Sequence, residues 1–558
     1  MHKDDRHRAV QSLLDKALVS VVIPASNEYS TLGHVIREAQ KISKRTEIIA
    51  VCNGCVDRSE QVAQAEGAKV LAIKETLGYD VGRAIGAKHA KGDVILFIDG
   101  DFVLPAAKLR AFCLEVIKGN DVVLNGYNGY RSKKRIHSTS QAKRLLNRCL
   151  GRADLGGSSL TAVPHALSRR ALETIGYPLL SVPPKALSKA VLSGLTVKKF
   201  RKINVAKRNK RKNRKRKHRR RLKQLIIGDH AEALAYVMQT KGVRSGFQDG
   251  NRLREWAAPT WSRKYMQMVQ QISDCLVKPK PPTNPPGDAI QSCSVIISAF
   301  NEEATLGPLL KQVQALQPLE IIVVENGSSD RTRSICTEHE VKGIFFNQRL
   351  GHDVGRAIGA REAAGDILLF LDGDIVFTAE ELKPFILACS EADLVLNNIR
   401  PYLKSSAMID YVSMAKAFLN RTLAMSRLKY SSLTAVPHAM TKEAVAKIGY
   451  EHLAVPPKAQ AIAALSGLKI EHIQGPNVLQ RNKQKANNIH TGNEVEALIL
   501  GDHLEALAWA QSVLGPRLKL ADDLRRRDIL AEIVETIHEC IQLEGDNSKG
   551  RDIWCENV

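Results

Sequence analysis

Short apolar runs alternate along this chain with longer stretches whose apolar residues recur at helical intervals. The runs at 19–25 (VSVVIPA) and 293–299 (CSVIISA) are apolar at almost every position, which is typical of strands buried on both faces. After the first run, Leu32, Val35 and Ile36 have the spacing of one face of a helix. Strands that alternate with helices in this way predict an α/β fold with a mainly parallel sheet covered by helices.

The same pattern occurs twice because the chain contains an internal duplication. LGYDVGRAIGAKHAKGDVILFIDGD at 77–101 recurs as LGHDVGRAIGAREAAGDILLFLDGD at 350–374. The pairing extends from about residue 19 to 254, here termed copy one, and from about residue 294 to 527, termed copy two. A repeat of this length is a duplicated domain rather than a short-period solenoid.

The duplication sets the expected domain limits. We expect an N-terminal extension at 1–18, a first domain at 19–277, a linker at 278–292, a second domain at 293–540 and a C-terminal tail at 541–558. The linker begins with KPKPPTNPPGD, whose prolines favour a stiff, extended segment. Such a linker is compatible with two domains that pack together and with two that are only tethered.

Each copy carries two aspartates at the end of an apolar strand, which is where ligands bind in parallel sheets. Carboxylates at positions i and i+2 of an extended chain project to the same side, and the glycine between them lets the chain turn. Mg²⁺ and Mn²⁺ take one or two carboxylates together with phosphate oxygens, and would offset the charge on a departing diphosphate. An ordinary turn is the alternative, which recurrence after the fourth strand of both copies disfavours. The expected metal ligands are Asp99, Asp101, Asp372 and Asp374.

The order and spacing of the motifs resemble those of the family 2 glycosyltransferases. Copy one reads IPASNE at 23–28, CNGCVD at 52–57, GYDVGRAIG at 78–86 and IDGD at 98–101; copy two reads SAFNEE at 298–303, VENGSSDRT at 324–332, GHDVGRAIG at 351–359 and LDGD at 371–374. The stretch VPPKAQAIAALSGLKI at 455–470 is more distantly similar to glucosyl-3-phosphoglycerate synthase-like enzymes. The resemblance implies two tandem GT-A (nucleotide-diphospho-sugar transferase) domains, each a mainly parallel sheet covered by helices. It further implies transfer of a sugar from a nucleotide sugar with Mg²⁺ or Mn²⁺ as cofactor.

The resemblance also implies which residues bind the donor. The base and ribose pocket would be lined by Asn27 and Glu28 in copy one and by Asn301 and Glu302 in copy two, supported by Asp57 and Asp330. Glu325 stands where the family usually has an aspartate that contacts the nucleobase, and copy one has Cys52 there. Arg83 and Arg356 would face the diphosphate, since a guanidinium suits phosphate oxygens; the alternative is that they begin a surface helix.

The usual acid–base positions of the family are substituted in this chain. TAVPH at 161–165 and 434–438 replaces a Gly-Glu motif, and Lys207 and Gln480 replace a late histidine. The repeated alternatives are His165, His438, Asp229, His230, Asp502 and His503. A histidine can act as a base near neutral pH. The two Asp-His pairs are also typical of helix N-termini with an acidic cap, which is the favoured alternative.

Charge is concentrated in one segment of copy one. The chain has 558 residues with 82 Lys+Arg, 58 Asp+Glu and a net charge of +24, and residues 198–223 hold 17 of the basic residues and no acid. Copy two has a loop of the same length, in which Glu494 and Glu496 lie opposite basic positions. The basic run is compatible with an anionic acceptor, an anionic membrane surface, another polyanion or a solvated loop.

Apolar runs, the N-terminus and the cysteines indicate the cellular compartment of the protein. The longest apolar runs, such as 367–371, are far shorter than the roughly 20 residues that span a bilayer, so no transmembrane segment is expected. The N-terminus lacks the apolar region of a secretory signal. Ten irregularly spaced cysteines indicate reduced thiols, and Cys52-x-x-Cys55 has no counterpart in copy two, which favours packing over zinc. We expect a cytoplasmic protein, with peripheral membrane binding through the basic run as an option.

Three functional hypotheses follow. The first is a metal-dependent glycosyltransferase with one or both copies active, acting on an unidentified acceptor, with an anionic acceptor as one option. The second is a chain with one catalytic copy and one degenerate copy that binds the acceptor or scaffolds its partner. The third is a polyanion-binding protein on a relict glycosyltransferase frame. The sequence favours them in this order.

Overall fold

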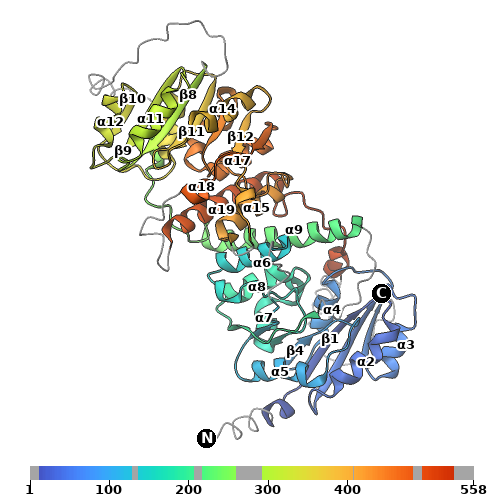
Figure 1. Cartoon of the computed structure of the whole chain (residues 1–558). Helices are drawn as coiled ribbons and strands as arrows, with labels where there is room; N and C mark the ends of the chain where they lie inside the picture. Colours follow the sequence, from blue (N-terminus) through green and yellow to red (C-terminus); the bar gives the residue numbers. More distant parts are fainter. Residues whose placement is uncertain are drawn as a thin grey trace, which may run out of the picture. The chain divides into compact units, whose positions relative to one another are not determined.

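The computed structural model describes residues 12–127, 136–205, 216–258, 292–405, 408–481 and 493–532 (Figure 1). The chain forms two compact units. Unit 1 consists of Met1–Gly129, Leu150–Ala233 and Leu520–Val558, and unit 2 consists of Tyr130–Cys149 and Leu234–Lys519. Most of the expected linker, at 278–291, and the expected tail at 541–558 lie outside the described residues. The domain limits expected from the repeat therefore stay a prediction.

Unit 1 is built on a seven-stranded sheet in the order β3-β2-β1-β4-β6-β5-β7. Only β6 runs antiparallel to its neighbours. The strands are β1 (Val19–Ala25), β2 (Thr46–Asn53), β3 (Lys69–Ile73), β4 (Val94–Phe97), β5 (Val122–Leu124), β6 (His165–Ser168) and β7 (Val197–Lys199). The helices are α2 (Tyr29–Gln40), α3 (Ser59–Ala65), α4 (Val81–His89), α5 (Ala106–Ile117), α7 (Arg169–Ile175), α8 (Pro183–Leu192) and the first part of α9 (Arg216–Lys241).

Helices cover both faces of this sheet, which explains why its strands are apolar at successive positions. In β1, Val21 and Ile23 pack into one hydrophobic cluster, whereas Val22 between them packs into the cluster on the opposite face. Alternate side chains of a strand point to opposite faces, so a strand with helices on both sides needs apolar residues everywhere. The expected α/β sheet is confirmed, with one antiparallel strand added.

Unit 2 repeats this topology with a sheet in the order β10-β9-β8-β11-β13-β12-β14. Its strands are β8 (Cys293–Ala299), β9 (Glu320–Asn326), β10 (Lys342–Phe346), β11 (Ile367–Asp372), β12 (Leu394–Asn397), β13 (His438–Thr441) and β14 (Ile470–Ile473). The helices are α11 (Leu306–Gln314), α12 (Thr332–Glu338), α13 (Val354–Glu362), α14 (Ala379–Leu387), α15 (Tyr411–Thr422), α16 (Lys442–Ile448), α17 (Pro456–Leu465), α18 (Val478–Arg481) and α19 (Glu494–Leu514), with α6 (Ser138–Cys149) of copy one added.

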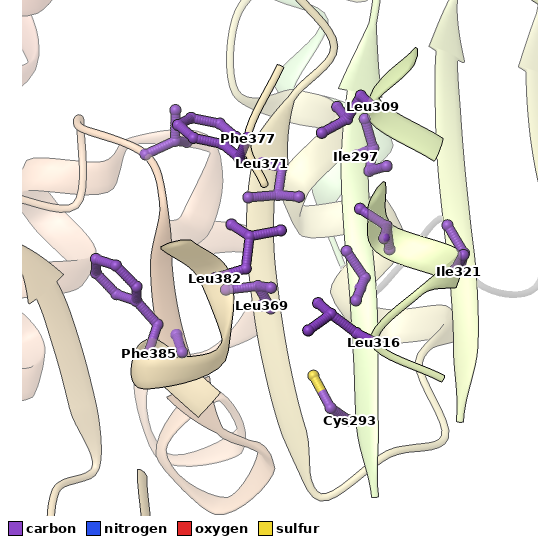
Figure 2. Packing of buried hydrophobic residues seen from close by; sticks show 14 of the residues in the cluster. Cys293, Ile297, Leu309, Leu316, Ile321, Leu369, Leu371, Phe377, Leu382 and Phe385 are labelled. Atoms are coloured by element: carbon purple, nitrogen blue, oxygen red, sulfur yellow. The ribbon is translucent and has the colours of Figure 1, made fainter. Parts of the chain in front are cut away.

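One apolar cluster of unit 2 lies between the sheet and the helices on one of its faces. Figure 2 shows Ile297, Leu369 and Leu371 from the strands against Leu309 and Leu382 from the helices. All five side chains are fully buried. This packing holds β8 and β11 side by side, and so brings their carboxyl ends together.

The two Asp-His pairs are not at helix N-termini, which corrects one of the sequence interpretations. Asp229 and Asp502 lie well inside α9 and α19. Helix α19 begins at Glu494, where the Asn493 side chain accepts a hydrogen bond of 3.0 Å from Glu496 N. The basic residues before Asp229 are themselves helical, because arginine and lysine are good helix formers.

Within the described part of the chain, no helix is both long and apolar enough to cross a membrane. The described cysteines are free thiols, and all but Cys55 are buried. Burial raises the pKa of the Cys52 thiol to about 12, which opposes metal or redox chemistry at Cys52-x-x-Cys55.

We expect Leu369→Ala to destabilise unit 2 by about 2–5 kcal/mol, because it removes a fully buried side chain from a central strand and leaves a cavity. The measurement is the midpoint of urea unfolding followed by tryptophan fluorescence. Leu387→Ala is the control, since Leu387 is 43% exposed. Equal midpoints for the two variants would contradict the packing described here.

Candidate active site

The candidate site of each unit lies at the carboxyl ends of three adjacent parallel strands. In unit 1 these are β2, β1 and β4, and in unit 2 they are β9, β8 and β11. Asp99 and Asp101 follow β4, while Asp372 ends β11 and Asp374 follows it. The strand order thus brings three motifs to the same edge of each sheet: Asn-Glu after the first strand, the Asn-Gly turn after the second, and Asp-Gly-Asp after the fourth.

A threonine holds the Asp-Gly-Asp turn in both units. Thr31 Oγ1 on α2 donates a hydrogen bond of 2.8 Å to the carbonyl of Gly100, and Thr305 Oγ1 donates one of 2.7 Å to the carbonyl of Gly373. Gly373 N also donates to Ser298 O at 2.9 Å. A Cβ at Gly373 would lie 3.1 Å from Ala299 Cβ, so the turn packs closely against the end of β8.

A buried arginine connects the first aspartate of each motif to the glycine-rich loop. Arg83 Nη2 donates to Asp99 Oδ1 at 2.8 Å, and its Nη1 forms an ion pair with Asp80. Asp80 has a left-handed backbone conformation (φ 66°) immediately before α4, which aims its carboxylate at the next turn of the helix. The Arg83 side chain is only 11% exposed, so its interpretation as part of a surface helix start is wrong.

Unit 2 repeats this arrangement in detail. Arg356 Nη2 donates to Asp372 Oδ1 at 2.9 Å and Arg356 Nη1 lies 2.8 Å from Asp353 Oδ1. Asp353 also has a left-handed backbone (φ 64°), and the arginine side chain is 6% exposed. The interpretation as a surface helix start is therefore wrong for Arg356 as well.

The charges of this cluster favour a divalent cation. Burial alone would lower the pKa of Arg356, but the carboxylates of Asp372 and Asp353, with a smaller effect from Asp374, raise it. Three carboxylates around one guanidinium leave a formal charge of −2 at the strand end. Burial and the equivalent carboxylates act on the pKa of Arg83 in the same way.

The described residues do not form a complete metal cage, since no three His, Cys, Asp or Glu side chains among them are gathered as ligands. This composition fits Mg²⁺ or Mn²⁺ better than a structural metal. Magnesium is commonly bound through one or two carboxylates, with water and substrate phosphate oxygens completing its coordination. The two aspartates of each DGD motif therefore fit a cation that arrives with a diphosphate.

The predicted base and ribose residues connect the ends of β1 and β2. Asn27 has a left-handed backbone (φ 59°), and its Oδ1 accepts a hydrogen bond of 2.9 Å from Val56 N. Glu28 N donates to Ser59 Oγ at 2.8 Å. Burial would raise the pKa of Asp57, but hydrogen bonds from Ser59 and the Tyr29 backbone lower it.

Copy two has the same connections. Asn301 Oδ1 accepts a hydrogen bond of 2.8 Å from Ser329 N, and Glu302 N donates to Thr332 Oγ1 at 2.8 Å. Asp330 Oδ2 accepts from Glu303 N at 3.0 Å. In both units these side chains shape the loop, and the carboxylates of Glu28 and Glu302 lie at its rim, half-buried.

Glu325 differs from the position that its motif suggests. The residue is fully buried, its carboxylate accepts a hydrogen bond from Ser328 N, and Arg333 Nη2 donates to it at 3.0 Å. Cys52, at the equivalent position of copy one, is also fully buried. The structure thus places both side chains inside the turn that follows the second strand of each unit, and the Glu325 hydrogen bonds stabilise that turn.

Four side chains at the site were not found from the sequence. Asp80 and Asp353 hold the arginines, and the only signal was their recurrence before each Val-Gly-Arg. In unit 2, Phe300 precedes Asn301, and the exposed Arg349 guanidinium lies 4.6 Å from the centroid of its ring. This pair offers a flat surface beside the predicted base pocket, a feature that copy one replaces with Ser26 and Thr76.

His165 and His438 lie next to the buried arginines but are enclosed. His165 stacks on Phe97 with ring centroids 4.8 Å apart, and its Nδ1 lies 3.1 Å from the Ala162 carbonyl. His438 stacks on Phe370 in the same way, at 5.0 Å. Burial, with the adjacent arginine charge, lowers the pKa of each imidazole to about 3. Both rings are therefore neutral and weakly basic at pH 7.

The Asp-His pairs of α9 and α19 are also committed to structural contacts. Asp229 forms an ion pair with Arg525, and Asp502 forms one with Arg252. His503 Nδ1 lies 2.7 Å from the Ile499 carbonyl one turn earlier, and burial lowers its pKa to about 3. His230 Nδ1 has the same relation to Ile226 O, at 2.7 Å. Their catalytic role stays a prediction.

We expect the stability of unit 1 to fall as the pH drops below about 6.5. An unfolded histidine takes up a proton there, whereas folded His165 stays neutral down to pH 3, so each pH unit costs about 1.4 kcal/mol. His165→Gln should flatten the slope of unfolding free energy between pH 6.5 and 5 by that amount. His34→Gln, at an exposed position, is the control. An unchanged slope in His165→Gln would contradict the burial of the imidazole.

Both copies match the same known protein family. The model of Glycosyl transferase family 2 matches residues 20–176 and 294–446, more than half of the chain. The undecaprenyl-phosphate 4-deoxy-4-formamido-L-arabinose transferase of Pectobacterium carotovorum is 29% identical over 124 residues, which cover 20% of this chain and 38% of that protein. Its namesake in Edwardsiella ictaluri is 30% identical over 122 residues, with the same coverage. The chain thus spans well under half the length of the curated relatives it matches.

Among solved structures, glucosyl-3-phosphoglycerate synthase from Mycobacterium tuberculosis in complex with uridine diphosphate is 20% identical. The alignment covers 40% of this chain and 82% of that chain, with a TM-score of 0.32. One family match begins in the first strand of each seven-stranded sheet, and the two sheets have the same strand order. The chain therefore belongs to glycosyl transferase family 2, with one family match on each of its two tandem GT-A domains.

Proposed function

We propose that this glycosyltransferase moves a sugar from a nucleotide-sugar donor, with Mg²⁺ or Mn²⁺, to an anionic acceptor. The observation that carries the proposal is the cluster of three aspartates around a buried arginine, which occurs at the same strand ends in both units. Its charge matches a divalent cation. Its guanidinium suits the phosphate oxygens that such a cation would bring.

In this proposal each side chain has a distinct task. Asp101 and Asp374, together with Asp99 and Asp372, would hold the cation. When bound, it would supply positive charge to offset the negative charge on a leaving diphosphate. Arg83 and Arg356 hold the first aspartate in place and add positive charge on the phosphate side. Because burial keeps these arginines rigid, little reorganisation is needed when the donor binds.

The nucleoside would lie over the connections between the first two strands of each unit. Asn27 and Glu28, with Asp57 below them, form this side in copy one; Asn301, Glu302 and Asp330 form it in copy two. Phe300 and Arg349 add a stacking surface only in copy two. We therefore propose that both copies bind a donor and that their nucleobase or sugar preferences differ. A degenerate, acceptor-binding copy one is the alternative.

An anionic acceptor is supported by the basic start of α9. Arg216, Lys217, Arg219 and Arg220 precede or flank His218, and all four are exposed. His218 Nε2 lies 3.0 Å from the Tyr79 hydroxyl in the glycine-rich loop of unit 1. The positive charge thus borders the proposed phosphate side of the copy-one site. The matched curated relatives are named for a phosphate-bearing lipid, which has the same chemistry. Most of the remaining run, at 206–215, lies outside the described residues.

We expect Asp101→Asn and Asp374→Asn each to lower turnover of the donor by about 100-fold in its own copy, because each removes charge from the cation site. The measurement is Mn²⁺-dependent release of nucleoside diphosphate from UDP-, GDP- and dTDP-sugars. The double variant should be inactive, and a single variant that alone abolishes turnover would identify the sole catalytic copy.

Glu173→Gln and Glu380→Gln are matched controls, since each removes one exposed carboxylate elsewhere on the same unit. They should retain wild-type turnover. Unchanged turnover in the Asp101→Asn, Asp374→Asn double variant would refute the proposed role of the two motifs.

We expect reversal of the basic run, with Arg216, Lys217, Arg219 and Arg220 changed to glutamate, to raise the KM for an anionic acceptor at least about tenfold and to weaken its salt dependence. The donor KM of copy two should not change. The probes are phosphoglycerate, a short oligonucleotide, and vesicles with and without anionic lipid. Binding of vesicles or oligonucleotide that persists while no nucleotide sugar is turned over would favour a polyanion-binding protein instead.

A further inference from the structure

The segments that follow the two long helices have exchanged places between the copies. Residues 520–532 follow copy two in the chain but belong to unit 1, and residues 242–258 follow copy one but belong to unit 2. The two segments correspond in sequence, as RLREW at 252–256 pairs with RRRDI at 525–529. Each segment makes the same contacts on the unit that receives it.

In unit 1 the receiving groups bind a fully buried arginine. The guanidinium of Arg525 forms an ion pair with Asp229 on α9, with Nη1 to Oδ2 at 3.2 Å. Its Nη1 also donates to the Ser181 carbonyl at 2.5 Å, and its Nε donates to Asp522 at 2.6 Å. Arg527 binds Glu232, one helical turn after Asp229, at 2.8 Å. None of the Arg525 side chain is exposed.

Unit 2 repeats these contacts with the segment from copy one. Arg252 forms an ion pair with Asp502, with Nη1 to Oδ2 at 3.1 Å, and its Nη1 donates to the Ala454 carbonyl at 2.7 Å. Arg254 binds Glu505 at 2.9 Å. The Arg252 side chain is also fully buried. Burial raises the pKa of Asp502, so this carboxylate depends on the guanidinium groups beside it to stay ionised.

Each exchanged segment also pairs with the backbone of a glycine-rich loop. In unit 1, Arg526 N donates to Leu77 O at 2.9 Å and Tyr79 N donates to Leu524 O at 3.3 Å. In unit 2, Leu253 N donates to Leu350 O at 2.8 Å, which is the equivalent bond.

The glycines of these loops are required by that close approach. A Cβ at Gly78 would lie 1.9 Å from Leu524 O, and one at Gly351 would lie 2.9 Å from Arg252 Cα. Both glycines also have positive φ, 77° and 91°. Apolar contacts extend the docking, since Leu530 packs into a cluster of unit 1 and Trp256 packs edge-on against Phe346 in unit 2, at 5.3 Å.

These loops lead directly into the candidate site. Asp80 and Arg83 follow Gly78 by two and five residues, and Asp353 and Arg356 follow Gly351 by the same intervals. Any motion of the loop therefore changes the position of the guanidinium that pairs with the first aspartate of the DGD motif. The buried ion pair of the exchanged arginine fixes the segment on the long helix, and the backbone bonds of the adjacent residues hold the loop. Loss of one partner from a buried ion pair is strongly destabilising.

We propose that Arg525 and Arg252 are positioning residues for the donor sites of the copies on which they dock. Each half of the chain thus supplies the segment that orders the glycine-rich loop of the other half. The role in donor binding rests on the proposed function, whereas the exchange of loop-ordering segments does not. Lysine cannot replace the bidentate guanidinium at either position.

The test uses hydrogen exchange of the full chain in Arg525→Lys and Arg252→Lys. Arg525→Lys should speed amide exchange about tenfold at 74–83 in copy one and leave 347–356 in copy two unchanged. Arg252→Lys should give the opposite pattern. Arg526→Lys is the control, because its exposed side chain pairs only with nearby Asp528 in the described contacts, and it should change neither loop.

A second variant disturbs the contact between the glycine-rich loop and residues 520–532 by a change in the loop. Gly78→Ala should speed exchange at both 74–83 and 520–530 and leave 347–356 unchanged, without altering Arg525. The proposal would be overturned if Arg525→Lys speeds amide exchange in the copy-two loop, in both loops equally, or in neither loop. Faster exchange throughout unit 1 in both Arg525→Lys and Gly78→Ala would overturn it as well.

The donor arm separates this proposal from the proposed function. With copy two silenced by Asp374→Asn, Arg525→Lys should raise the donor KM about tenfold and leave kcat within about twofold, because loop order affects binding before the chemical step. The hydrogen-exchange result could hold, with each variant loosening only the loop of the opposite copy, while the protein binds no UDP, GDP or dTDP with Mn²⁺. That outcome would support the exchanged segments and overturn the proposed function. An equal loss in kcat and kcat/KM would overturn the positioning role.

Discussion

A guanidinium buried at the carboxyl end of a parallel sheet is the interaction on which the rest of each unit depends. Removing such a charge from water is costly unless carboxylates and carbonyls surround it. Arg83 meets this condition through Asp80 and Asp99, and Arg356 through Asp353 and Asp372. The left-handed backbone of Asp80 and Asp353, and the strand-end positions of Asp99 and Asp372, place the carboxylates that solvate this group. The same carboxylates leave a net negative site at the strand end.

The duplication makes this constraint visible, because every part of it occurs twice. The copies differ at positions that do not contact the buried arginine or its aspartates. Cys52 and Glu325 fill the same buried position by different means, one as a thiol and one as a carboxylate paired with Arg333. The basic start of α9 has no equivalent in copy two, where α19 begins with Glu494. The two copies thus share the arginine–aspartate cluster at the strand ends and differ in the neighbouring turn and at the start of the long helix.

The exchange of terminal segments links the two copies more closely than a linker does. A tethered pair of domains needs no shared residues, whereas here each compact unit contains residues from both halves of the sequence. The buried pairs Arg525–Asp229 and Arg252–Asp502 make each glycine-rich loop depend on the opposite half. Each half alone therefore lacks part of its own site, which gives a physical reason for keeping both copies in one chain.

Much of this architecture was predictable from local patterns. Continuous apolar strands such as β1 and β11 required a sheet covered on both faces, and Asp99 and Asp372 at strand ends identified the edge that carries the site. Helix limits were less accessible: Asp229-His230 looked like a helix start because the basic residues before it gave no apolar periodicity, and its counterpart Asp502-His503 was interpreted in the same way. The burial of Arg83, Arg356 and Glu325 could not be predicted either. Nothing in the local sequence identifies the oppositely charged partners that make the burial of a charged side chain possible.

The sequence by itself determined the fold class, the duplication and the family. The order of strands and helices along the chain and the spacing of the motifs can be read without knowing any tertiary contact. The tertiary structure decided which carboxylate each arginine binds, that His165 and His438 are enclosed and neutral, and that residues 242–258 and 520–532 dock on the opposite copy. These features depend on pairs such as Arg525 and Asp229, which lie far apart in the sequence. Such pairs meet only when the sheets and helices have packed, since it is burial that makes each charge require its partner.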